Sequence, residues 1–204
     1  MKIFVVGPHP DDLEYGCGGT LCKLAKSGHK INLLVMTKGQ LGGNEKVREK
    51  EQEKSAKILK ANLLWGGFTD TQIPMMKSTI NMIESHIKDI KPDVIFCPFP
   101  EDTHQDHRAV AQATITATRY IPNVLFYEVP TSVDFSPPNV FVDIGKVFKN
   151  KIQLLKAHKS QVFSTRVADL SILETTHATA LFRGMQNRVK YAESFVPLRL
   201  QVFL

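Results

Sequence analysis

The sequence contains no run of apolar residues long enough to cross a membrane. Such a span needs about 18 consecutive apolar residues, whereas the first apolar run, at residues 3–6, ends at Gly7 and Pro8. This run is also too short for the core of a signal peptide, so it indicates a first strand rather than a targeting segment. We therefore expect a cytoplasmic protein without a membrane span.

Cysteine is scarce. Cys17, Cys22 and Cys97 cannot all pair, and no C-x-x-C motif is present. This excludes a disulfide scaffold and indicates free thiols in a reducing compartment. Internal repeats and low-complexity segments are also absent. The chain has 204 residues, of which 43% are hydrophobic and 23% are charged. These values are typical of a globular protein and predict a single domain over residues 1–204.

Nucleic-acid-binding motifs are missing, although the net charge is +6. No arginine-rich arm, zinc finger or RNP-like aromatic motif accompanies this charge. The densest charged segment, residues 46–60, mixes both signs at helical spacing and indicates a solvated helix face. We therefore expect no nucleic-acid partner. The alternative, a nucleic-acid binder, predicts salt-sensitive binding to a duplex.

Nucleotide-binding and serine-hydrolase motifs are absent as well. A dinucleotide site needs G-x-G-x-x-G after the first strand, but this turn reads G-P-H-P-D-D. Its two prolines lack N–H donors, and its two acids would repel a pyrophosphate. Neither a G-x-x-x-x-G-K-[ST] loop nor a G-x-S-x-G elbow occurs, so the chemistry must come from other residues.

What the sequence does contain is an alternation of strand and helix patterns. Apolar runs at 3–6, 31–37 and 93–99 are typical of strands buried on both faces. Residues 77–90 place isoleucines on one helix face. The other expected strands are 62–68, 124–129 and 140–144, and the end of the chain, 195–204, is expected to be extended. The other expected helices are 19–26, 46–60, 109–118, 146–158 and 168–188. This order predicts an α/β fold with a mostly parallel central sheet between two layers of helices.

Two polar clusters follow two of these strands. His9-Pro10-Asp11-Asp12 comes after the first strand, and the residues from 101 to 108 (EDTHQDHR) come after the strand at 93–99. Ligands of such sheets bind beyond the carboxyl ends of the strands. Either cluster alone would be explained by a turn or a helix cap. Together, at equivalent positions, they favour one shared site.

Metal chemistry explains these residue types. Imidazole nitrogen and carboxylate oxygen are good ligands for Zn²⁺. A catalytic zinc has three protein ligands and an open position for water, and two His with one Asp meet that need. A spare carboxylate can then act as a base toward the water. The same ligands suit other divalent ions.

These segments resemble the LmbE/PIG-L family of zinc-dependent deacetylases. The resemblance lies in four features: GPHPDDLEYGCGGTL, TKGQLGG, the pair Arg48 and Glu51, and DTHQDHRAV. It extends from residue 1 to about 115. Two later segments, HKSQ at 158–161 and the helix at 182–195, are also similar to the family. The family is Rossmann-like and removes acetyl groups from molecules that contain N-acetylglucosamine. The resemblance therefore implies a hydrolase of a linear amide bond with one zinc, or another divalent cation, as cofactor.

The resemblance also implies individual roles. The metal ligands would be His9, Asp12 and His107. Asp11 would be the general base.

Three further roles follow from the same matches. His104, polarised by Asp106, would stabilise the oxyanion or protonate the leaving amine, and Arg48 would contact the sugar. Glu14 stands one position later than the corresponding acid of many members, which leaves the subfamily open. The roles of Glu14 and of three residues near the last helix also stay open: Arg183, Arg188 and Tyr191.

The expected partner is a small N-acetylated sugar or glycoconjugate, which the sequence does not specify further. Because the family is often oligomeric, a homo-oligomer is compatible with it. Other functions remain open: a phosphoesterase, often with two metal ions, an amidase of another small molecule, or a binding protein that releases no acetate.

Overall fold

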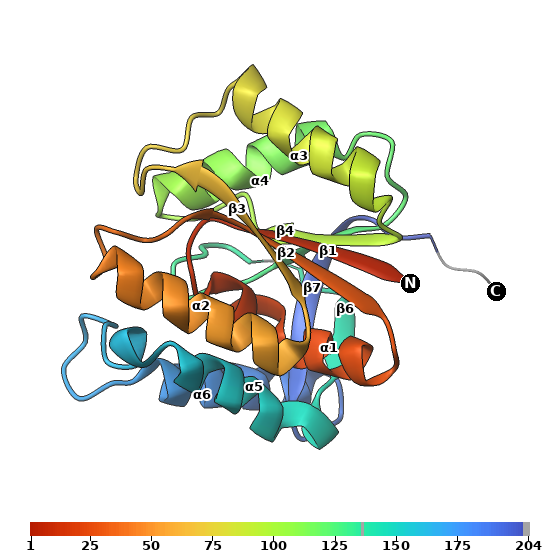
Figure 1. The fold of residues 1–204 in the computed structure, drawn as a ribbon. Helices are drawn as coiled ribbons and strands as arrows, with labels where there is room; N and C mark the ends of the chain where they lie inside the picture. Colours follow the sequence, from red (N-terminus) through yellow and green to blue (C-terminus); the bar gives the residue numbers. More distant parts are fainter. Residues whose placement is uncertain (136, 202–204) are drawn as a thin grey trace.

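The computed structural model describes residues 1–135 and 137–201. Within them, the strands are β1 (Lys2–Gly7), β2 (Lys30–Thr37), β3 (Asn62–Phe68), β4 (Val94–Pro98), β5 (Val124–Tyr127), β6 (Val140–Asp143) and β7 (Ala192–Arg199). The helices are α1 (Asp12–Lys26), α2 (Glu45–Leu59), α3 (Lys77–Ile90), α4 (Gln105–Ala117), α5 (Phe148–Ala157) and α6 (Ile172–Gln186), with the short 3-10 helices η1 (Gly145–Val147) and η2 (Lys159–Gln161). Figure 1 shows their arrangement.

The strands of this described part form one sheet in the order β3-β2-β1-β4-β5-β7-β6. The first five of these are parallel, whereas β7 runs antiparallel to β5 and β6 antiparallel to β7. The expectation of a mostly parallel sheet is confirmed. The chain moves outward from β1 to β3 and then returns to place β4 on the other side of β1. The boundary between β1 and β4 is therefore the topological switch point, where ligands of such sheets bind.

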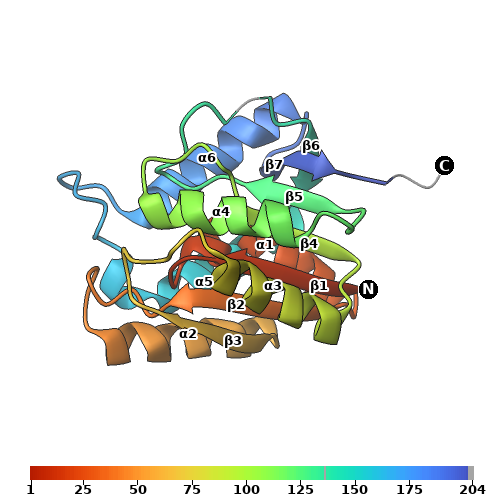
Figure 2. The same cartoon turned by 90° about the horizontal axis from the view of Figure 1, so that it is seen from above.

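Helices cover both faces of the sheet, as expected for three layers. Helices α3 and α4 lie on one face, and α1, α2, α5 and α6 lie on the other (Figures 1 and 2). Successive side chains of β1 alternate between the two faces. Ile3 and Val5 join the core beneath the four helices, and Phe4 and Val6 join the core beneath α3 and α4. This fully apolar strand is thus buried on both sides.

Two elements match their expected bounds, and one differs markedly. The strand at 62–68 and the helix at 77–90 are observed as β3 and α3. Helix α1, however, begins at Asp12 rather than at Gly19. The glycines in this segment allow close packing. A Cβ on Gly16 would lie 2.2 Å from the Tyr127 ring, and one on Gly19 would lie 2.9 Å from Ile144.

The other bounds shift by smaller amounts. Helix α4 begins at Gln105 rather than at 109, because Nδ1 of His104 accepts the Asp106 N–H and starts the helix earlier. Helix α6 covers only 172–186 of the expected 168–188. The extended end is observed as β7, which ends at Arg199. Residues 202–204 of that expectation lie outside the described residues.

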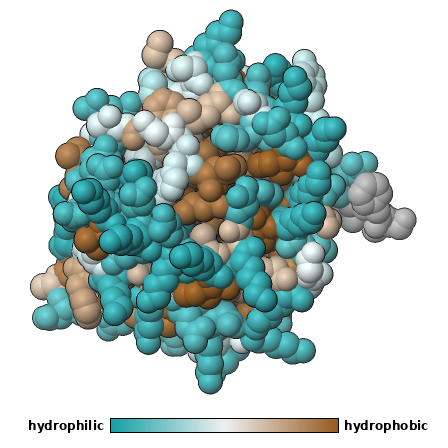
Figure 3. Space-filling model, viewed as in Figure 1, coloured by the Kyte–Doolittle hydropathy of each residue, from teal (hydrophilic) through white to brown (hydrophobic). Residues whose placement is uncertain are grey.

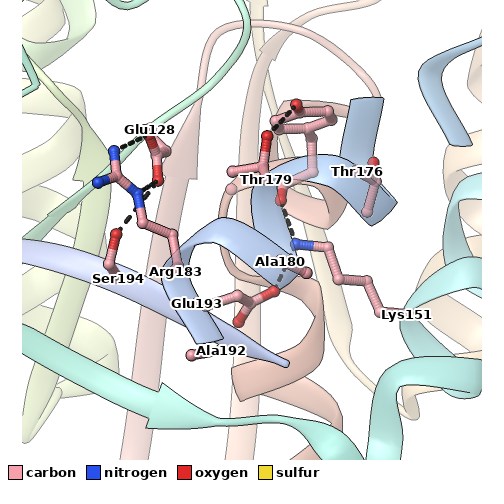
Figure 4. Close-up of a pocket in the computed structure, with 11 residues that line it drawn as sticks. Glu128, Lys151, Thr176, Thr179, Ala180, Arg183, Ala192, Glu193 and Ser194 are labelled. Atoms are coloured by element: carbon pink, nitrogen blue, oxygen red, sulfur yellow. Dashed lines mark hydrogen bonds and ion pairs between the residues drawn. The ribbon is translucent and has the colours of Figure 1, made fainter. Parts of the chain in front are cut away.

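A buried ion pair joins the C-terminal elements to α1, as Figure 4 shows. Nζ of Lys151 on α5 donates to Oε1 of Glu193 on β7 at 2.6 Å. Glu193 also accepts the backbone N–H groups of Gly19 and Thr20 at 2.8 and 2.6 Å. These contacts hold the middle of α1 against α5 and β7.

The three residues left open near the last helix lie away from those clusters. Arg183 makes a bidentate pair with Glu128, with both N···O distances at 2.7 Å (Figure 4). Tyr191 stacks on Phe148 with ring centroids 4.0 Å apart. Arg188 is exposed. Arg183 and Tyr191 therefore contact neighbouring elements of the protein.

The outer surface is mixed in polarity. Figure 3 shows polar side chains over most of the face seen in Figure 1, with hydrophobic ones gathered near its middle. The edge strand β3 passes there and leaves Leu64 and Trp65 half-buried. Among the described residues, no helix combines the length and the apolar character that a membrane crossing requires.

Candidate metal and active site

The switch point brings the two polar clusters together, as their positions after β1 and β4 predicted. Nδ1 of His9 lies 3.2 Å from Oδ2 of Asp12. Nε2 of His107 lies 3.3 Å from His9 Nδ1 and 3.4 Å from the same Asp12 oxygen. These three atoms form a nearly equilateral triangle beyond the carboxyl ends of β1 and β4.

The triangle fits a metal ion in both size and chemistry. Tetrahedral coordination with bonds of about 2.0–2.1 Å separates neighbouring ligand atoms by about 3.3 Å. The three separations of 3.2, 3.3 and 3.4 Å match that edge. Two imidazole nitrogens and one carboxylate oxygen are typical donors for zinc and for several other divalent ions.

Carboxylates hold both imidazoles from behind. Nε2 of His9 lies 3.0 Å from Asp70 and 3.1 Å from Asp106. Nδ1 of His107 lies 3.0 Å from Asp102. Such contacts fix the ring orientation and the tautomer, and they raise the basicity of the opposite nitrogen. They leave His9 Nδ1 and His107 Nε2 as the atoms that face Asp12.

Two other groups are compact enough to hold a cation: His9 with His104 and His107, and His9 with Asp70 and Asp106. In the second of these groups, both carboxylates also accept backbone N–H groups. Asp106 accepts those of Thr71 and Ile73 at 2.7 and 3.2 Å, and Asp70 accepts that of Leu41 at 2.9 Å. Asp12 accepts a backbone N–H in the same way, from His9 at 3.0 Å. Asp70 and Asp106, however, both lie on Nε2 of His9, the nitrogen that faces away from Asp12 and His107, and this position favours a supporting role for the two acids.

The electrostatics of the triangle favour bound positive charge. Burial acts to raise the pKa of Asp12, but His107 and His9 outweigh it and hold that pKa well below its usual range. Burial acts to lower the pKa of His107, but Asp12 and Asp102 raise it to about 9. The carboxylates thus favour positive charge on the imidazoles, and a bound cation would meet the same attraction.

Asp11 lies beside the triangle in a strained conformation. Its φ of 89° falls in the left-handed region that few residues other than glycine adopt. Burial raises the pKa of its carboxyl group to about 6, against the opposing effect of the Arg48 guanidinium. A carboxylate with a pKa just below neutrality is ionised at pH 7 and still able to accept a proton, as a general base must.

Arg48, which was expected to contact the sugar, makes most of its contacts with the protein itself. Its guanidinium donates to the carbonyls of Gly39 and Pro10 at 2.9 and 2.8 Å, and it lies 3.4 Å from Asp11. The side chain is 6% exposed. It therefore holds the loop that carries Asp11, and only a small part of it reaches the cleft.

The carboxylate of Asp106, which was expected to polarise His104, contacts a different ring. It contacts His9, and only the backbone N–H of Asp106 reaches His104, at Nδ1. Because Nδ1 of His104 accepts this bond, a neutral His104 ring carries its proton on Nε2. Burial, together with the charges of His9 and His107, lowers the pKa of His104 and keeps that ring neutral. His104 is thus a hydrogen-bond donor whose ring meets the backbone of Asp106 rather than its carboxylate.

Helix α2 supports the loop after β1 with a polar face that the sequence analysis missed. Gln52 accepts the Asp11 N–H at 3.3 Å and donates to Glu14 at 2.8 Å. Ser55 donates to the same Glu14 oxygen at 2.6 Å. The signal was available, because Arg48, Gln52 and Ser55 follow one another at the spacing of a single helix face.

Two other groups were missed for different reasons. Asp70 is a lone acid after β3, and nothing near it in the sequence links it to His9. His158 ends the expected helix 146–158 and carries no sign of its partner: it is buried, and its Nε2 lies 3.5 Å from Oε2 of Glu14. Glu14, whose role was open, therefore connects α2 to the end of α5.

A cleft surrounds Asp11, Asp12 and His104, and it has two arms. The polar arm, about 250 Å³, is also lined by Leu41, Gly42, Arg48, Asp70, Thr71 and Arg166. The apolar arm, about 440 Å³, is also lined by Val129, Pro130, Thr131, Ser164, Thr165, Val167, Leu170, Ile172 and Thr175. Gln161 lines both arms. A ligand at the triangle can therefore extend in two directions.

Comparisons with known proteins agree with this arrangement. The family model "PIG-L: GlcNAc-PI de-N-acetylase" matches residues 4–118, which contain the whole triangle. The chain is similar to the uncharacterized deacetylase YaiS of Escherichia coli, with 37% identity over 167 residues that cover 78% of this chain and 90% of that protein. It is similar to the diacetylchitobiose deacetylase of Thermococcus kodakarensis, with 30% identity over 96% of this chain and 83% of that protein.

The fold is similar to a solved structure as well. The conserved protein TT1542 of Thermus thermophilus superimposes with a TM-score of 0.88 at 26% identity, covering 99% of this chain and 96% of that one. The expected Rossmann-like sandwich and the expected deacetylase class are both confirmed. The chain belongs to the PIG-L family of de-N-acetylases.

Proposed function

We propose that this protein removes the acetyl group from an N-acetylglucosamine-type sugar conjugate, with His9, Asp12 and His107 as the ligands of one zinc ion. The observation that carries the proposal is the triangle of their donor atoms, with sides of 3.2–3.4 Å, beside the buried base candidate Asp11. A cation bound there would polarise the acetamide carbonyl and lower the pKa of water.

The chain's own groups complete the reaction. Asp11 accepts a proton from the attacking water, because its pKa of about 6 leaves it ionised at neutral pH. His104, neutral and protonated on Nε2, donates a hydrogen bond to the oxygen on which negative charge develops. The C–N bond then breaks, and Asp11 returns the proton to the departing amine. The products are acetate and a free amino sugar.

The test is acetate release from a panel of N-acetylated sugars and conjugates, before and after treatment with a chelator. The proposal expects release that the chelator abolishes and that one equivalent of zinc restores. Binding without acetate release would favour a non-catalytic sugar-binding protein. Phosphate release at two metal ions per chain would favour a phosphoesterase.

A further inference from the structure

The polar arm of the cleft suits the sugar ring. Hydroxyl groups that leave water without new hydrogen bonds lose free energy, so a sugar needs polar neighbours. In this arm Thr71, Gln161 and Arg166 provide a hydroxyl, an amide and a guanidinium within one small space. A ring placed there would keep its acetamide group next to Asp11.

The apolar arm has a different character. Val129, Leu170 and Ile172 form its walls, and Val167, although apolar, is 59% exposed. Beyond Asp11, Asp12 and the two histidines that it shares with the metal site, its described lining residues include no ionisable side chain. Burying an apolar group there is favourable, whereas a charged group would find no partner.

The wall of this arm is an ordered segment between η2 and α6. The Thr165 hydroxyl donates to the carbonyls of Val167 and Leu170 at 3.2 and 2.7 Å. The N–H of Ile172 donates to the carbonyl of Val162 at 2.9 Å. These bonds hold Val167 and Leu170 toward the cleft without help from a ligand, so the arm is pre-formed.

The geometry points to a substrate in which N-acetylglucosamine carries an uncharged, apolar aglycone, such as an alkyl or aryl group. This inference rests on the proposed function, because it assumes that the acetamide lies at the metal site. With the sugar in the polar arm, the rest of the substrate continues into the apolar arm. The hydroxyl groups of Ser164, Thr165 and Thr175 in this arm already donate to backbone carbonyls, so a second sugar would find few free donors there. The lining residues of the arm include no Lys or Arg to pair with an anionic aglycone.

A matched series of glycosides tests the inference. The methyl, phenyl and 4-carboxyphenyl glycosides of N-acetylglucosamine, in both anomers, are compared by kcat/KM for acetate release. Burial of the phenyl ring predicts a kcat/KM at least about tenfold above that of the methyl glycoside. The added carboxylate should remove this gain. Equal values for the methyl and phenyl glycosides, or a preference for the carboxylate, would overturn the inference while leaving the deacetylase function in place.

Two variants of one segment locate the effect. Val167→Asp places a charge in the apolar arm and should bring the phenyl-to-methyl ratio close to one. Phe163→Asp makes a similar change nearby, at a residue that is 77% exposed and lies outside the lining of both arms. It should leave the ratio unchanged. A Val167→Asp enzyme with the wild-type ratio would overturn the assignment of this arm.

Calorimetry separates this inference from catalysis. The deacetylated phenyl glycoside should bind with a more negative heat-capacity change than the deacetylated methyl glycoside, because it buries more apolar surface. Identical heat-capacity changes would contradict the apolar arm. If no glycoside in the series releases acetate although the phenyl compound binds in this way, the proposed function fails and the binding site stands.

Discussion

Asp11, the proposed general base, has a strained backbone conformation. Its backbone is left-handed, its carboxylate lies 3.4 Å from Arg48 in the cleft that His9 and Asp12 also line, and Gln52 accepts its N–H. Left-handed geometry in a non-glycine residue costs about 1–3 kcal/mol and persists only where the surroundings impose it. Here Arg48 and Gln52 impose it from one face of α2.

Replacing Asp11 by Asn tests its role as the base. The substitution keeps the size of the side chain, and Asn tolerates the left-handed conformation, so the fold and the zinc content should not change. Loss of the base should lower kcat by about 10²–10⁴-fold. Asp89→Asn, an exposed change on α3, is the control. Turnover of Asp11→Asn at the wild-type rate would show that another group takes the proton.

Substitution of Asp102 tests whether the carboxylate behind His107 contributes to zinc binding. It is buried and contacts His107 Nδ1 at 3.0 Å, so Asp102→Ala should weaken zinc binding by about 10–100-fold. Competition with a chromophoric chelator measures this change. Asp102→Asn retains an oxygen acceptor and should recover part of the affinity. Unchanged affinity in the alanine variant would remove Asp102 from the metal site.

His158 makes stability depend on pH. Burial acts to lower its pKa, but the charge of Glu14 raises it above the ordinary value. Its stabilisation is therefore complete below the unfolded pKa of about 6.5 and is lost as pH rises through the folded pKa. Burial acts to raise the pKa of Glu14, but His158 lowers it, so the share from Glu14 is lost in acid, below about pH 4.3.

The matching experiment is urea denaturation of the wild-type protein and of His158→Gln. The wild-type advantage in free energy of unfolding should be largest between about pH 5 and 6.5 and should shrink as the pH rises further. An advantage that does not change with pH would show that His158 contributes by packing alone.

At the scale of elements, α1 can pack closely against the sheet because it has glycine at the point of contact. A methyl group on Gly16 would lie 2.2 Å from the ring of Tyr127, which is buried and whose hydroxyl donates to the carbonyl of Val6. Gly16→Ala should therefore lower the free energy of unfolding by at least about 1–3 kcal/mol. Gly18 is the matched control, because its added Cβ would lie 3.4 Å from Leu154. Gly18→Ala should be neutral or stabilise by up to about 1 kcal/mol. Equal effects in denaturation experiments would contradict this packing.

The same helix shows where prediction from sequence stops. The helix at 77–90, whose isoleucines lie on one face, has the bounds that its pattern predicts. Helix α1 does not, because glycine disfavours a helix locally and the neighbour that requires it, Tyr127, is remote in sequence. The meeting of His9 with His107 was predictable because each follows a strand. The contact of Asp70 with His9 was not, because a lone acid carries no sign of its partner.

At the scale of the whole molecule, strand order creates the site. Strands β1 and β4 are neighbours because the chain reverses its direction of travel across the sheet, and this places two separate loops around one point. The central claim is that a single cation is held there by groups from both loops. The layers of helices hold this edge firmly enough to keep three donor atoms within 3.4 Å of one another.

Anomalous X-ray scattering at the zinc edge, from crystals grown with zinc, tests this claim most directly. We predict one ion about 2.0–2.2 Å from His9 Nδ1, Asp12 Oδ2 and His107 Nε2. An ion held by Asp70 and Asp106 on the other nitrogen of His9, or no ion at this edge of the sheet, would contradict it.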